Sequence, residues 1–81
     1  MVAMKTQDIV EAMAKRLRGA KGEANMTDAA AGDALGKSRS TVQAMIANPG
    51  NARVRDLLDL LETYGKDPDE VWAAAFEDAR R

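Results

Sequence analysis

The chain has 81 residues, 46% of them hydrophobic and 31% charged, which suffices for one small folded domain and little more. It contains neither cysteine nor histidine, so disulfides, thiolate or imidazole metal sites and hydrolytic triads are excluded, and we expect neither an enzyme nor a cofactor. The net charge of −1 hides an asymmetry, because residues 1–55 carry nine basic and five acidic side chains whereas residues 56–81 carry three and eight. A basic face can therefore coexist with an acidic one.

Apolar residues at helical spacing predict the first helix over residues 7–18, with Thr6 as its N-cap and Gly19 just beyond its end. The inward face of this helix holds Ile9, Val10, Met13 and Leu17. Residues 20–26 are then expected to form a loop. Near the end of the helix lies a basic cluster to which we assign no function: Lys15, Arg16, Arg18 and Lys21.

Two short helices follow, joined by a tight turn. Thr27 is a suitable N-cap for a helix over residues 28–35, which Gly36 ends, and Ser38 for a helix over residues 39–47. The first of these helices presents a face of small residues: Ala30, Ala31, Ala34 and Leu35. The inward residues of the second are Val42, Met45 and Ile46.

The remainder of the chain predicts two further helices after a turn at residues 48–51. The first spans residues 53–64, with apolar positions at Val54, Leu57, Leu58, Leu61 and Tyr64. The last begins at Asp67, where capping explains the carboxylates without a metal site, and its apolar stripe comprises Val71, Trp72, Ala75 and Phe76. No strand pattern competes, so we expect an all-α fold, a compact bundle of about five helices in a single domain over residues 1–81.

The functional signal lies in the helix-turn-helix unit over residues 27–47. Two helices separated by a short turn with glycine cross steeply, so the second projects from the domain and fits the major groove of DNA. Its outward side chains suit base edges, because arginine pairs with guanine, glutamine with adenine, and alanine contacts the thymine methyl. These outward residues are Arg39, Ser40, Gln43 and Ala44.

Basic residues surround this helix, and no acidic residue lies between positions 37 and 55. Such a window is typical of a surface that contacts DNA phosphates. Besides Arg39, the positive charges in the window are Lys37, Arg53 and Arg55.

The same residues resemble a known family. The pair LG at 35–36, the run SRSTV at 38–42 and the segment LLDLLETYG at 57–65 are similar, in order, to the Cro/C1-type helix-turn-helix of bacterial and phage repressors, a lambda-repressor-like DNA-binding domain. The resemblance implies a five-helix domain, usually dimeric, whose third helix reads the major groove. By position it assigns base reading to Arg39, Ser40, Gln43 and Ala44, and phosphate contact to Thr41, Arg53 and Arg55.

Three residues depart from the family's pattern. Asp28 stands where the family often has a glutamine that contacts phosphate, and a carboxylate there would repel phosphate. Gly32 stands where alanine is usual, at a cost to the helix of up to about 1 kcal/mol. Lys37 replaces a common apolar turn residue, and its charge suits DNA.

We therefore expect a small sequence-specific transcriptional regulator, a repressor of the phage or mobile-element type that binds double-stranded DNA as a homodimer. No apolar run could cross a membrane and the N-terminus lacks a signal peptide, so we expect a cytoplasmic protein with no membrane partner. No small-molecule substrate is expected. Trp72 and Phe76 either complete the core or form the surface on which two copies associate.

Two alternatives are open at this point. An antitoxin would share this DNA-binding fold and would also neutralise a toxin. A helical protein-interaction module without DNA binding would present the acidic residues within 56–78 to a basic partner, and Asp28 and the isoelectric point near 5.3 favour it.

Overall fold

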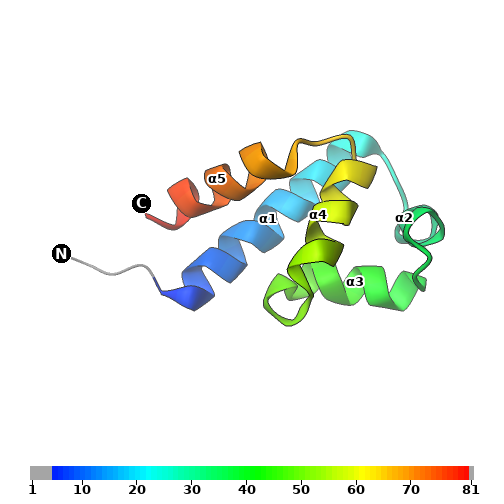
Figure 1. Ribbon diagram of the computed structural model, residues 1–81, viewed down its shortest axis with the longest axis horizontal. Helices are drawn as coiled ribbons and strands as arrows, with labels where there is room; N and C mark the ends of the chain where they lie inside the picture. The colour runs from blue at the N-terminus through cyan, green and yellow to red at the C-terminus, as the bar shows by residue number, and fades with distance from the viewer. Residues whose placement is uncertain (1–4, 81) are drawn as a thin grey trace.

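The computed structural model describes residues 5–80, and this part of the chain forms helices and no strand. In chain order the elements in Figure 1 are α1 (Thr6–Ala24), α2 (Asp28–Leu35), α3 (Arg39–Ala47), the 3-10 turn η1 (Pro49–Asn51), α4 (Val54–Thr63) and α5 (Pro68–Ala79). The predicted all-α fold with five helices is confirmed. None of the helices within residues 5–80 is long and apolar enough to cross a bilayer.

Helix α1 is the longest element, and α3, η1 and α5 pack against it. Helix α5 lies along α1, whereas α3 and η1 contact α1 elsewhere on its surface (Figure 1). Helix α2 packs on α3 and α4, and α4 also contacts α5. Figure 1 shows that α3 and α5 lie on different sides of α1, so the two outer surfaces of the molecule are well separated.

The hydrophobic core forms where α1, α3 and α4 meet. Its largest fully enclosed side chains are Leu17 of α1, Val42 of α3, and Leu60 and Leu61 of α4. Burying each such side chain contributes about 1.5–3 kcal/mol. The predicted inward face of α3 is confirmed, because Val42, Met45 and Ile46 are all buried. On α1, Met13 and Leu17 are buried as predicted, whereas Ile9 and Val10 are only half-buried.

The buried stripe of α4 differs from the predicted one. It consists of Leu57, Leu60, Leu61 and Tyr64, at the spacing i, i+3, i+4 and i+7. Leu58 is half-buried, and Val54 is 57% exposed, so the predicted inward position of Val54 is wrong. Val54 is the first residue of α4, where the helix begins at the edge of the fold and no neighbouring element covers it.

Helix α1 is longer than predicted and runs through Gly19 and Gly22 to Ala24. The predicted end at Gly19 is therefore wrong, and only residues 25–26 of the predicted loop over residues 20–26 lie outside a helix. The reason is packing, because Ala20 is buried and continues the inward stripe of the helix. Burial on that side outweighs the low helix propensity of Gly19 and Gly22. Neither glycine is required by a close contact, because a Cβ built on either would have no atom within 4 Å.

The ends of α1 also differ from expectation. Asn25 ends the helix in the left-handed conformation, with φ of 51°, and its N–H donates to the Gly22 carbonyl at 3.2 Å. At the other end Thr6 is the first helical residue rather than the N-cap. Lys5 occupies the cap position and forms no side-chain cap bond.

Side-chain caps begin three of the other helices, as the sequence predicts. Thr27, Ser38 and Asp67 each accept a hydrogen bond of 3.0–3.1 Å from a backbone N–H in the first turn of α2, α3 and α5. Such a cap stabilises a helix by about 1 kcal/mol. Capping therefore accounts for the Asp67 carboxylate.

Candidate nucleic-acid interface

The turn between α2 and α3 is held by backbone groups. Gly36 ends α2 in the left-handed conformation, with φ of 70°, which favours glycine. The Lys37 N–H donates to the Gly32 carbonyl at 2.8 Å, and Ser38 then caps α3. The chain changes direction within three residues, so α3 crosses α2 steeply, as Figure 1 shows with α2 seen close to end-on.

Gly32 allows this turn to lie directly against α2. A Cβ built on Gly32 would lie 2.5 Å from the Lys37 carbonyl oxygen, and this oxygen belongs to the backbone and cannot rotate away. The predicted small face of α2 is only partly correct, because Ala31 and Gly32 are buried while Ala30 and Ala34 are exposed. The departure from the family's usual alanine therefore has a steric cause.

The outer face of α3 is exposed as the helical spacing predicts. Its exposed side chains are Arg39, Ser40, Gln43 and Ala44. Thr41 is exposed as well, and its Oγ1 lies 2.9 Å from Ser38 Oγ at the start of the helix. Because the opposite side of α3 is buried in the core, the helix is held firmly while these side chains face outward. Their contact with DNA stays a prediction.

A groove runs along one side of α3, between this helix and the region where α1 ends and α2 begins. We call it the α1-side groove, and its lining residues include Arg18, Lys21, Asp28, Arg39 and Gln43. The sequence assigns no function to Arg18, because it predicts that the first helix ends at this residue and does not predict which other elements lie next to it. The longer α1 places Arg18 in the same groove as two predicted base-reading residues.

A second groove lies on the other side of α3, against η1 and α4. We call it the α4-side groove, and its lining residues include Thr41, Ala44, Arg53 and Asp56. The fold thus brings together Thr41 and Arg53, two residues predicted to contact phosphate. Arg55 is exposed on the first turn of α4 and does not line this groove.

Lysines and arginines differ in their partners at this face. The Lys21 ammonium lies 2.8 Å from Asp28 Oδ1, and the Lys37 ammonium lies 3.4 Å from Asp56 Oδ1. The Asp28 carboxylate, which alone would repel a phosphate, is thus paired with the Lys21 ammonium. By contrast, no ion pair or hydrogen bond within residues 5–80 involves the side chains of Arg18, Arg39, Arg53 and Arg55.

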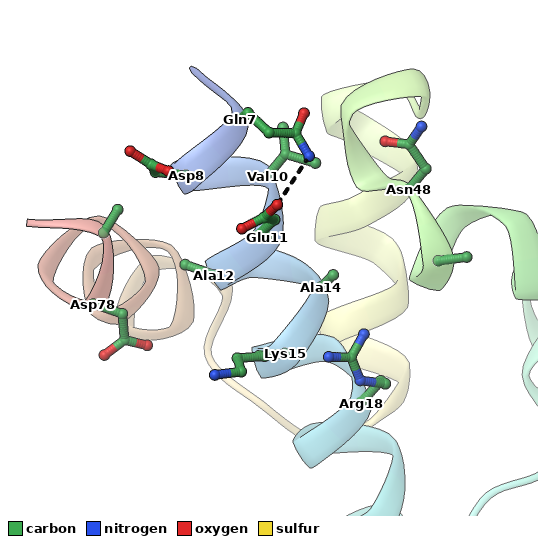
Figure 2. A pocket seen from close by; sticks show the side chains of 12 residues that line it. Gln7, Asp8, Val10, Glu11, Ala12, Ala14, Lys15, Arg18, Asn48 and Asp78 are labelled. Atoms are coloured by element: carbon green, nitrogen blue, oxygen red, sulfur yellow. Dashed lines mark hydrogen bonds between the residues drawn. The ribbon is translucent and has the colours of Figure 1, made fainter. Parts of the chain in front are cut away.

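The basic cluster of α1 is divided between different parts of the surface. The Arg16 guanidinium donates two hydrogen bonds to Asp78 of α5, of 2.7 and 2.9 Å, and this interaction raises the pKa of Arg16 above its ordinary value. Lys15 and Arg18 line a further groove, shown in Figure 2. There they share a face of α1 with Gln7 and Glu11, and Asn48 lies across from them (Figure 2).

The aromatic residues of α5 are half-buried. The ring centroids of Trp72 and Phe76 are 6.3 Å apart and the rings are tilted by 51°. Trp72 packs partly against the core, as one of the two sequence interpretations predicts. Both rings also keep exposed surface, so an association surface at this place stays a proposal.

Tyr64, at the end of α4, places its hydroxyl in the core. This hydroxyl is buried and has no hydrogen-bond partner within residues 5–80. Burial raises the pKa of Tyr64 above its ordinary value, and the negative charge of Asp28 raises it further. The buried hydroxyl therefore experiences the charge of Asp28, which lines the α1-side groove.

Comparison with known proteins identifies one family model, described as helix-turn-helix, which matches residues 15–71. The matched region begins within α1 and ends within α5, so it contains both helices of the helix-turn-helix unit and all the residues named for the two grooves beside α3. It covers well over half of the chain. No curated protein and no solved structure matches the chain.

Proposed function

The chain belongs to the Cro/C1-type helix-turn-helix family of DNA-binding transcriptional regulators, and on this premise we propose that it is a small repressor of the phage or mobile-element type. It binds double-stranded DNA with α3 in the major groove. The observation that carries the proposal is the outer face of α3, where four predicted base-reading residues are exposed on a helix whose inner face is buried.

The base-reading residues of the proposal have suitable chemistry. Arg39 donates to guanine O6 and N7, and Gln43 pairs with the N6 and N7 groups of adenine. Ser40 hydrogen-bonds to a base edge, while Ala44 allows close approach and contacts a thymine methyl. Arg39 and Gln43 lie four residues apart and therefore on one side of the helix, next to the α1-side groove.

Phosphate contacts in this proposal come from residues around α3. Thr41 and Arg53 act from the α4-side groove, Arg55 from the start of α4, and Lys37 from the turn. These contacts orient the protein and supply the salt-dependent part of the affinity, whereas sequence preference comes from the base edges.

The repressor of this proposal is a cytoplasmic homodimer formed from copies of one domain. Two copies bind half-sites about one helical turn apart and block access to a promoter. The half-buried pair Trp72 and Phe76 supports a self-association surface on α5, because a two-fold dimer buries the same apolar patch twice. This surface lies away from α3 and leaves the helix free (Figure 1).

The test is selection of duplexes from a random DNA library, followed by fluorescence anisotropy on the selected sequence with excess nonspecific competitor. We expect a sequence motif and binding that survives the competitor. Arg39→Ala is expected to weaken binding and to relax specificity at one base pair. Arg80→Ala is the matched control, because it removes the same side chain at the end of α5, the helix that lies on a different side of α1 from α3 (Figure 1).

Other outcomes point elsewhere. Binding without any preferred sequence would contradict base reading by α3. Absence of DNA binding at low salt would contradict the proposal as a whole and would favour a protein-interaction module. A neighbouring toxin gene whose product binds the purified chain would assign it as an antitoxin.

A further inference from the structure

Each groove beside α3 is lined by a carboxylate that forms an ion pair with a lysine. In the α1-side groove the pair is Lys21 with Asp28, and in the α4-side groove Asp56 holds Lys37 of the helix-turn-helix turn. Each pair joins two different elements of the fold. The carboxylates thus stand on the two sides of α3, where the two phosphate strands that border a major groove would pass.

Partial burial separates these two pairs from ordinary surface ion pairs. The Asp28 side chain is 11% exposed and that of Asp56 is 23% exposed, with Lys21 at 36% and Lys37 at 28%. Charges in such positions are screened less by salt than fully exposed charges. Each carboxylate therefore attracts its lysine more strongly than it would on a fully exposed surface.

We propose that Asp28 and Asp56 act as internal competitors of DNA phosphate, which hold Lys21 and Lys37 in the free protein and keep its affinity for DNA low. This inference rests on the proposed function. A carboxylate oxygen and a phosphate oxygen accept hydrogen bonds from the same ammonium donors, so DNA takes a lysine only when the carboxylate releases it. The released carboxylate then lies near phosphate and repels it.

The arginines are the positive charges that remain available. Arg18, Arg39, Arg53 and Arg55 have no internal acidic partner within residues 5–80, and all four are exposed. The salt dependence of wild-type binding therefore reflects mainly the arginines, and Lys37 makes its proposed phosphate contact fully only when Asp56 no longer holds it. Sequence-independent binding stays weak, although base reading by α3 is unaffected.

The experiment compares Asp28→Asn and Asp56→Asn with the wild type on a fluorescein-labelled duplex of mixed sequence, at about 50 and 200 mM salt. The matched control is Asp69→Asn, which makes the same change of net charge at an exposed position on α5. Circular dichroism shows that each variant is folded, and because the two pairs are independent, either variant alone suffices for the test.

The expected result is tighter binding at the lower salt for both groove variants and a salt slope steeper by about 0.9 for each lysine released. Over a fourfold change in salt, this slope amounts to an additional loss of about 3.5-fold in affinity. Asp69→Asn should follow the wild type. Adding Lys21→Gln to Asp28→Asn should return the slope to the wild-type value, since the released ammonium is then absent.

Two results would overturn the inference, and they are distinguishable. If the wild type binds the duplex and both groove variants behave like Asp69→Asn, the internal competition is absent while the proposed DNA binding stands. If neither the wild type nor the groove variants bind at the lower salt, the inference and the proposed function both fail. Binding by the groove variants alone would support the inference.

Discussion

Replacing Gly32 with alanine should destabilise the protein, although alanine is the better helix former. By helix propensity alone, Gly32→Ala would stabilise α2 by up to about 1 kcal/mol. The added Cβ, however, would lie 2.5 Å from the Lys37 carbonyl oxygen, and real Cβ contacts essentially never fall below 3.0 Å. The turn would therefore have to move away from α2 by at least half an ångström.

Such a movement has two costs. Overpacking of a tight contact costs about 1–3 kcal/mol. It also strains the 2.8 Å hydrogen bond from the Lys37 N–H to the Gly32 carbonyl, which contributes about 0.5–1.5 kcal/mol. After subtracting the gain in propensity, we expect a net loss of about 1–3 kcal/mol. For a domain of this size each kcal/mol lowers Tm by about 4–8 °C.

Gly19→Ala is the matched control for this experiment. Gly19 is also inside a helix, yet a Cβ there would have no atom within 4 Å. We therefore expect Gly19→Ala to raise the stability by about 0.5–1 kcal/mol. Urea and thermal denaturation of both variants give the two changes. An equal gain in stability for both variants would refute the close contact between the turn and α2.

Three further predictions concern α3 and the core. Arg39→Ala should cost about 1–3 kcal/mol of binding free energy and relax specificity at one base pair, and equal weakening on unrelated sequences would reassign Arg39 to phosphate. Ser38→Ala removes the acceptor of the Thr41 N–H and should lower the unfolding free energy by about 1 kcal/mol; an unchanged urea midpoint would contradict this. Tyr64→Phe removes a buried hydroxyl without a partner in residues 5–80 and should raise the stability by about 1 kcal/mol. Because burial raises the pKa of Tyr64, the wild type should lose stability above about pH 10 as the hydroxyl ionises, and the phenylalanine variant should lose less.

The sequence predicts the helices well where local signals determine them. Thr27, Ser38 and Asp67 are residues whose side chains cap helices whatever surrounds them, and Gly36 ends α2 because few other residues adopt its φ of 70°. The inward face of α3 is also local, since the helical period alone decides it.

Tertiary packing decides the features that the sequence does not predict. Gly19 is a common signal for the end of a helix, yet α1 continues because Ala20 is buried against other elements. Val54 fits the apolar period of α4, yet it is exposed because no neighbouring element covers the side of the first turn on which it lies. Both results depend on how elements distant in the sequence pack, so periodicity could not reveal either of them.

The candidate site divides in the same way. Exposure of the four outward residues of α3 follows from spacing, whereas the position of Arg18 beside them follows from the unexpected length of α1. The pairing of Lys37 with Asp56 joins residues 19 positions apart, and only the packing of α4 brings them together.

The division of α3 into a buried and an exposed face has a consequence for how its specificity could change. The three buried residues, Val42, Met45 and Ile46, hold the helix in the core, and none of them is among the residues proposed to read bases. Substitutions at positions 39, 40, 43 and 44 alter no core contact, so new operators can be acquired through mutations that are close to neutral for folding. A library randomised at these four positions should consist mostly of folded proteins, which makes the domain a practical scaffold for selecting new DNA specificities.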